Sequence, residues 1–79
     1  MESATIGQRI AQARREIPES QRELAERVGM SYSQLSRIEK GHNLPRPATI
    51  RELAAALGVN ARWLASGSGP MRDGVNAEA

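Results

Sequence analysis

The feature that most constrains this chain is a single glycine near the middle of a polar, charge-rich run. The run reads SQRELAERVGMSYSQLSRIEKG and extends from Ser20 to Gly41, with Gly29 close to its centre. A glycine inside a helix costs about 1 kcal/mol relative to alanine, and it therefore usually marks a turn. A capping-box pattern, Ser20 followed by Glu23, begins one helix before this glycine, and Ser31 begins a second cap after it. We therefore predict two short helices joined by a tight turn at Gly29.

The spacing of small and apolar residues around this turn is typical of a helix-turn-helix. Ala25 is small enough to let the two helices approach closely, and Gly29 allows the chain to turn. The positions that would hold the second helix against the first are apolar: Leu24, Val28, Met30, Leu35 and Ile38. A generic helical hairpin has a similar outline, so the joint pattern, and not the glycine alone, favours the helix-turn-helix.

Helical spacing in the rest of the chain predicts three more helices, so we expect an all-α fold of five helices without a strand. The first helix has apolar residues at intervals of four, three and four: Ile6, Ile10, Ala13 and Ile17. The fourth helix has Pro47 in its first turn, where a missing N–H does no harm, and it ends at Gly58. The fifth helix is short, and Asn60 is placed to cap it.

The 79 residues allow one small domain. We expect a helix-turn-helix domain over residues 1–67 and a flexible tail, or the start of a linker, over residues 68–79, which read SGPMRDGVNAEA. Cysteine is absent, so neither a disulfide framework nor a thiolate metal site is expected. No apolar run approaches the ~20 residues that a membrane helix needs.

The charge balance is mildly basic, with 11 Lys and Arg residues against 9 Asp and Glu residues, a formal net charge of +2. All but one of the basic residues are arginines, and the exception is Lys40. The arginine fork matches phosphates and guanine edges better than the lysine ammonium does. A net charge this small is equally compatible with simple solubility, so the charge alone decides nothing.

Taken together, these segments resemble the phage lambda-type repressor and Cro (XRE-like) helix-turn-helix family. The resemblance covers roughly residues 5–67 and rests on IGQRI, SQRELAERVG, SRIEKG and IRELAAALGVNARWL. The ending ALGV…WL followed by GSGP is most like the N-terminal DNA-binding domain of a phage immunity repressor. The resemblance implies a compact five-helix fold, double-stranded operator DNA as partner, and a homodimer on that DNA. Pro18-Glu19 stands where the family commonly has Gly-Leu, which puts the corner before the second helix in question.

The second helix of the pair should read DNA, because recognition helices present their N-terminal residues to base edges in the major groove. At ~100° per residue, Leu35 and Ile38 face inward and the polar residues face out. The expected base-reading residues are Ser31, Tyr32, Ser33, Gln34 and Arg37. We predict a bidentate contact from Arg37 to guanine, the commonest specific contact, with a solvated surface arginine as the alternative. Tyr32 would contact a thymine methyl group or a phosphate, or else pack along its own helix, and Gln34 has helix capping as its alternative.

A second group is expected to contact phosphates or the minor groove: Gln21, Lys40, Asn43 and Arg46. Gln21 matches the family's phosphate-binding glutamine, which also touches the recognition helix. Arg46 follows the recognition helix at a place from which it could reach the minor groove, as an arginine does in some relatives. Ordinary surface polarity is the alternative for each. His42 lies in a loop and is expected to be solvated and not catalytic.

Arg14 and Glu39 each lie at the edge of an apolar stripe, Arg14 beside Ile10 and Glu39 beside Leu35. An unpaired, half-buried charge is costly, so we predict that they pair and join the first helix to the third. The resemblance implies the same structural ion pair. The alternative is two exposed charges without a common role.

These observations predict a sequence-specific DNA-binding transcriptional regulator, a phage or prophage repressor that binds a palindromic operator as a dimer in the bacterial cytoplasm, at the host nucleoid. The alternative is an antitoxin-like or adaptor module that binds protein, although the tail MRDGVNAEA is short and polar for that purpose. An enzyme is not expected, because the chain has no cysteine, one loop histidine and no carboxylate pair in an apolar pocket. No metal, cofactor or small-molecule ligand is expected.

Overall fold

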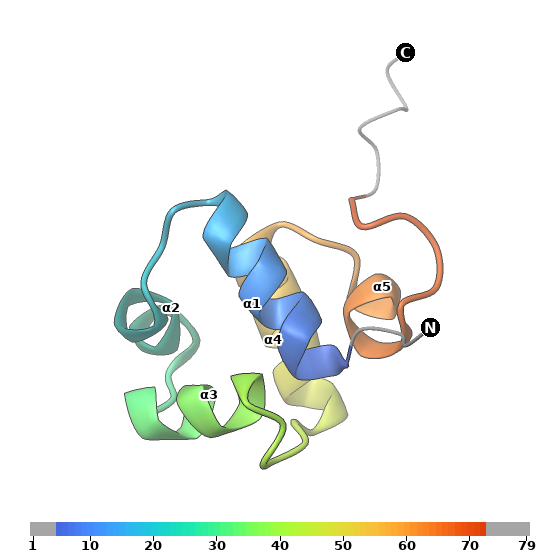
Figure 1. The fold of residues 1–79 in the computed structure, drawn as a ribbon. Coiled ribbons are helices and arrows are strands. Elements are labelled where there is room, and N and C mark those ends of the chain that lie inside the picture. The colour runs from blue at the N-terminus through green and yellow to red at the C-terminus, as the bar shows by residue number, and fades with distance from the viewer. Residues whose placement is uncertain (1–4, 73–79) are drawn as a thin grey trace.

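The computed structural model describes residues 5–72, and within this range it contains helices but no strand. The helices are α1 (Ile6–Glu16), α2 (Gln21–Val28), α3 (Tyr32–Glu39), α4 (Pro47–Leu57) and α5 (Ala61–Ser66). In Figure 1, α1 lies across α4 at the centre, with α2 and α5 on opposite sides of α1 and α3 below it. The prediction of an all-α fold with five helices is confirmed.

The helix caps and the turn predicted around Gly29 are present in the structure. The Ser20 hydroxyl accepts a hydrogen bond from the Glu23 backbone N–H at 3.1 Å, and the Glu23 carboxylate accepts one from the Ser20 N–H at 2.9 Å. Gly29 has φ 75°, the left-handed region that favours glycine, and ends α2. The Ser31 hydroxyl accepts from the Gln34 N–H at 3.0 Å and so caps α3. These bonds provide partners for backbone N–H groups at the N-terminal ends of α2 and α3, which have no acceptor within the helix.

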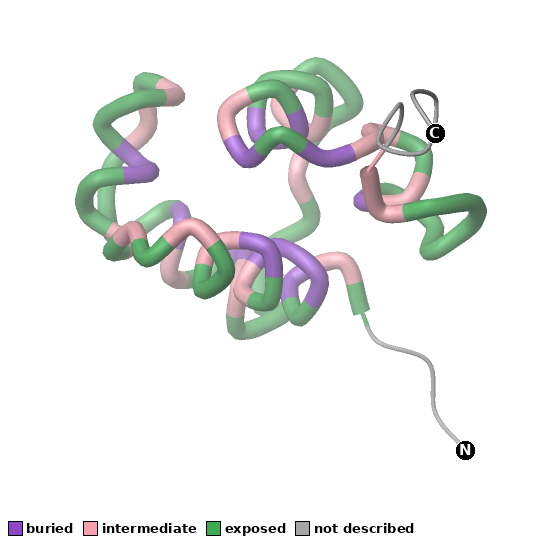
Figure 2. The backbone as a smooth tube through the Cα atoms, turned by 90° about the horizontal axis from the view of Figure 1, so that it is seen from above, coloured by how far each residue is buried: buried purple, intermediate pink, exposed green. Residues whose placement is uncertain are grey.

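The hydrophobic core is one cluster to which every helix contributes. Its largest fully buried side chains are Ile10, Leu24, Leu35, Leu53, Leu57 and Leu64. Val28 and Met30, on either side of the turn, are partly buried against this cluster. Figure 2 shows buried and exposed stretches alternating along the helices, as expected for amphipathic helices around one core. The core therefore holds α3 by Leu35 and Ile38 and leaves its opposite face in solvent.

Gly7, in the first turn of α1, faces the backbone at the end of α3. A Cβ atom at this position would lie 2.4 Å from the carbonyl oxygen of Ile38 and 2.7 Å from that of Glu39. Both distances are far shorter than van der Waals contact, so only glycine allows α1 to lie this close to α3. The apolar spacing within the first helix gives no sign of this close approach.

The first residues after α5, which fall in the expected tail, make contacts with the helical domain. The backbone N–H of Asn60 donates to the Met71 carbonyl at 2.7 Å, and the half-buried Met71 packs against the core. Arg72 pairs with Glu16 of α1 at 3.0 Å. An apolar side chain and an ion pair thus hold two residues beyond the predicted domain boundary. The rest of the expected tail, residues 73–79, lies outside the described residues, and the boundary at residue 67 stays a prediction.

Candidate nucleic-acid interface

The outer face of α3 is polar and open to solvent. The structure places four of the predicted base-reading residues there and the fifth, Ser31, at the N-cap of α3, each of them exposed: Ser31, Tyr32, Ser33, Gln34 and Arg37. Leu35 and Ile38, on the opposite face, are 0% and 2% exposed. Because the buried pair fixes the rotation of α3 about its axis, the polar face has a defined direction.

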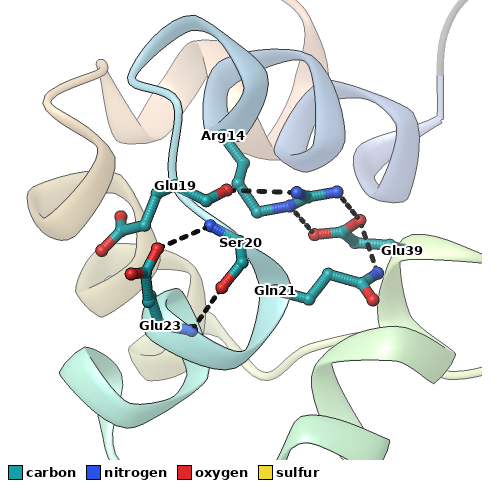
Figure 3. Close-up of polar contacts among 6 residues, drawn as sticks. All are labelled: Arg14, Glu19, Ser20, Gln21, Glu23 and Glu39. Carbon is teal, nitrogen blue, oxygen red and sulfur yellow. Dashed lines mark hydrogen bonds and ion pairs between the residues drawn. The ribbon is translucent and has the colours of Figure 1, made fainter.

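A carboxylate at the end of α3 joins the three N-terminal helices (Figure 3). The Nε and Nη2 atoms of Arg14 donate to the two oxygens of Glu39 at 2.8 and 2.9 Å, and Nη1 donates to the Glu19 carbonyl at 3.2 Å. The Glu39 side chain is 5% exposed and the Arg14 side chain 17%. The hydrogen bond to Glu39 raises the pKa of Arg14, against the opposing effect of burial. The ion pair expected between these two residues is therefore present and largely buried.

Gln21 belongs to the same network. Its amide nitrogen Nε2 donates to Oε1 of Glu39 at 2.9 Å, which ties the first residue of α2 to the last residue of α3. A primary amide has two N–H donors and a carbonyl acceptor, so this bond leaves capacity for a further partner such as a phosphate. The residue predicted to contact phosphate is thus held in place by the carboxylate of the ion pair.

The loop after α3 carries the other predicted phosphate or minor-groove contacts. Lys40 follows the last residue of α3, and Lys40, Asn43 and Arg46 are all exposed. Asn43 and Arg46 border a groove together with Gln34, on the outer face of α3, and the exposed His42. Arg46 stands at the N-cap of α4 without forming a side-chain cap bond. The structure therefore brings Asn43 and Arg46, two of the residues predicted to contact phosphates or the minor groove, next to Gln34, a predicted base-reading residue.

The Tyr32 ring has a partner that the sequence did not reveal. Tyr32 is 42% exposed, and the guanidinium carbon of Arg22 lies 4.5 Å from the centre of its ring. This is a cation–π contact between the first turns of α2 and α3. It settles neither alternative proposed for Tyr32, because the ring packs against α2 and remains accessible.

Comparison with known proteins agrees with this arrangement. Residues 10–64, more than half of the chain, match the model of the helix-turn-helix family. The chain belongs to the helix-turn-helix family.

Three relatives show how far the similarity extends. A transcriptional regulator for conjugative element R391 of Providencia rettgeri is 37% identical over 71 residues, which are 90% of this chain and 33% of the regulator. The immunity repressor of Bacillus phage phi105 is 40% identical over 55 residues, 70% of this chain and 38% of that protein. The crystal structure of the P22 c2 repressor with a synthetic operator has a TM-score of 0.78 and 26% identity, covering 84% of this chain and 100% of that one. The chain spans about a third of the curated regulators it matches first.

Two arginines of this helix-turn-helix domain serve the fold, although neither is among the residues to which the sequence assigned a role. Arg9 is 8% exposed, and its Nε and Nη2 atoms donate to the carbonyls of Leu64 and Ala65 at 2.9 and 3.0 Å. Burial lowers the pKa of Arg9 from its usual value. Arg27 donates to Glu19 at 2.7 Å and to the Ala56 carbonyl at 2.8 Å.

The position of Arg9 could have revealed its role. It lies three residues after Ile6 and four before Ala13, and therefore within the apolar stripe of α1. A position of the same kind, at the edge of that stripe, predicted the pairing of Arg14. Arg9, Arg14 and Arg27 are thus occupied by structural bonds, and the arginine count overstates the charge available to DNA.

Within residues 5–72, no group of histidine and carboxylate side chains is placed to hold a metal ion. None of the helices in this range has the length and apolar character needed to cross a bilayer.

Proposed function

We propose that this helix-turn-helix domain is a sequence-specific regulator of transcription that binds double-stranded DNA, and that it acts as a phage- or prophage-type repressor at a palindromic operator. The observation that carries the proposal is the polar, solvent-facing side of α3, held in one orientation by Leu35 and Ile38. The similarity to the P22 c2 repressor, solved with a synthetic operator, and to an immunity repressor supports it. A regulator of this kind acts by binding and not by catalysis, and works where the DNA is, in the bacterial cytoplasm.

In this proposal, α3 enters the major groove with its N-terminal residues toward the base edges. Its N-cap Ser31 and its exposed residues Tyr32, Ser33, Gln34 and Arg37 read the base sequence, with Arg37 as the fork for guanine. The phosphate and minor-groove contacts come from the N-terminus of α2 and from the loop after α3: Gln21, Lys40, Asn43 and Arg46. Phosphate contacts fix the register of the helix in the groove, and base contacts give the preference.

Replacing Arg37 with alanine should cost about 1–3 kcal/mol of binding free energy on the preferred site and relax the preference at one base pair per half-site. Replacing Arg46 with alanine should weaken binding on most sequences and reduce the salt slope by about one unit, because one phosphate is no longer neutralised. Each change removes one positive charge, so the pair separates base reading from simple electrostatics. Titrations on the preferred site and on scrambled DNA, at several salt concentrations, measure both effects.

The preferred site for these titrations comes from selection out of a random DNA pool, read by sequencing. If Arg37→Ala and Arg46→Ala lose equal affinity on both DNAs, Arg37 does not read bases. If selection with the unchanged chain enriches no sequence, repression at a specific operator is wrong, and the alternative of a protein-binding module is favoured.

We also propose that two copies bind the operator, with half-site centres about 34 Å apart. Leu44, in the loop before α4, is 83% exposed, and this loop and α5 are the proposed contact regions between copies. In α5, Trp63 offers less surface to a second copy than its size suggests, because it packs partly against the core of its own chain.

A full palindrome should therefore bind more tightly than one half-site, by roughly 10²-fold if the two sites act together. Titration of two duplexes of equal length, one with both half-sites and one with a scrambled second half-site, measures this ratio. Equal affinity for the two duplexes would show that each copy binds alone.

A further inference from the structure

Arg22 is the second residue of α2, and its guanidinium lies over the Tyr32 ring at 4.5 Å. Tyr32 is the first residue of α3. The contact therefore lies at the N-terminal end of the reading helix, where base-reading residues are concentrated. Both side chains are exposed, so the pair is at the surface.

The stability of the fold gives little reason for an arginine at this position. A positive charge in the first turn of a helix is unfavourable, because the N-terminal end of the helix dipole is positive. Among residues 5–72, Arg22 is not paired with a carboxylate, whereas Arg14, Arg27 and Arg72 are. A cation–π contact at an exposed site contributes only a small stabilisation.

Arg22 can hold the ring and bind an anion at the same time. The guanidinium is planar and stacks on an aromatic ring by its face, while its N–H donors point outward from its edge. A phosphate group approaches that edge and forms bidentate hydrogen bonds with it. Stacking on Tyr32 therefore restricts the orientation of the fork without using its donors.

We propose that Arg22 is part of the DNA-binding surface, where it binds a backbone phosphate and positions the Tyr32 ring for base reading. This inference rests on the proposed function of the domain. It extends the surface beyond α3 and the loop that follows, to a second side chain of α2. Arg22 acts on base preference through Tyr32, and on affinity directly through the phosphate.

Two substitutions separate these roles. Arg22→Lys keeps the charge but loses the planar group that stacks on the ring, so the salt slope should be retained while preference at the base pair read by Tyr32 is relaxed. Arg22→Met removes the charge as well, so the salt slope should also fall by about 0.9. In a Tyr32→Ala background, Arg22→Lys should have no further effect on base preference, because the ring it positions is gone.

Arg15→Met is the matched control. Arg15 is exposed in the last turn of α1 and is not among the residues proposed to contact DNA. Arg15→Met removes one positive charge, as Arg22→Met does, but leaves the proposed surface unchanged. Base preference and salt slope should therefore stay close to those of the unchanged chain. Melting curves of every variant confirm that the compared proteins are folded at the binding temperature.

The stacking of Arg22 on Tyr32 can be tested without DNA. The chain has one tyrosine, so the ring signals of Tyr32 in a proton NMR spectrum belong to a known residue. These signals should shift in Arg22→Lys and Arg22→Met and stay in place in Arg15→Met. Unchanged ring signals in both Arg22 variants would overturn the positioning role.

The DNA-binding measurements test whether Arg22 belongs to the DNA-binding surface. If Arg22→Met matches the unchanged chain, or matches Arg15→Met, in affinity, salt slope and base preference, the inference is wrong although the domain still binds a specific site. If the unchanged chain itself selects no preferred sequence, the proposed function fails and the inference fails with it. Selection with the unchanged chain therefore distinguishes failure of the proposed function from failure of the inference about Arg22.

Discussion

Replacing Arg14 with methionine is expected to lower the free energy of unfolding by roughly 3–5 kcal/mol. The change leaves Glu39, whose side chain is 5% exposed, without the cation that forms two hydrogen bonds with it. Removing one partner of a buried pair is costly because the remaining charge stays in a poorly solvated place. Glu39→Gln should destabilise the fold in the same direction, since Arg14 then faces a neutral side chain. Chemical denaturation followed by circular dichroism measures both changes.

A surface ion pair in the same chain provides the control. Arg72 and Glu16 are 33% and 45% exposed, so Arg72→Met should cost less than about 1 kcal/mol. The double substitution Arg14→Met with Glu39→Met should be less destabilising than the sum of the two single changes, because it leaves no unpaired charge. If Arg14→Met is as mild as Arg72→Met, the Arg14–Glu39 pair does not stabilise the fold in solution.

Gly7→Ala is expected to destabilise the domain by about 3 kcal/mol, at the upper end of the usual range for overpacking. The added Cβ would lie 2.4 Å from the Ile38 carbonyl oxygen, and the neighbouring atoms belong to the α3 backbone. Backbone cannot rotate away as a flexible side chain can, so α1 and α3 must move apart. Because this movement would also strain the ion pair between Arg14 and Glu39, the destabilisation extends beyond one residue.

The sign of the Gly7→Ala effect is diagnostic. Helix propensity alone predicts that alanine stabilises a helical position relative to glycine, by up to about 1 kcal/mol in the interior of a helix. A gain in the melting temperature would therefore contradict close packing of α1 on α3. Gly29→Ala is a useful comparison: its Cβ would meet nothing within 4 Å, so only the left-handed backbone opposes it, at about 1–2 kcal/mol.

The features that the sequence predicted well are local ones. The Ser20 cap, the Gly29 turn and the Asn60 cap each depend on a few neighbouring residues, and each is found in the structure. The Arg14–Glu39 pair was also predicted, because a charge at the edge of an apolar stripe needs a partner. The DNA-contacting roles of the exposed residues remain predictions, since exposure alone does not establish them.

The features that the sequence did not reveal depend on how one helix lies against another. The close approach of Gly7 to α3, the bonds from Arg9 to the end of α5, and the stacking of Arg22 on Tyr32 each join separate helices. Spacing within one helix shows which face is buried, but not which backbone atom that face meets. The packing of Met71 was missed for the same reason, because a Gly- and Ser-rich segment resembles a linker and its composition does not show that Met71 packs against the core.

The bonds between Arg9 and the end of α5 also bear on the order in which the domain folds. The bond to Leu64 joins positions 55 residues apart, whereas α2 and α3 are joined by the short turn through Gly29. The entropy cost of closing a loop rises with its length, so contacts between near neighbours in sequence form at lower cost. We therefore expect α2 and α3 to associate early, and α5, the shortest helix, to dock last on α1. The part of the chain that we propose reads DNA is then assembled before the domain around it is closed.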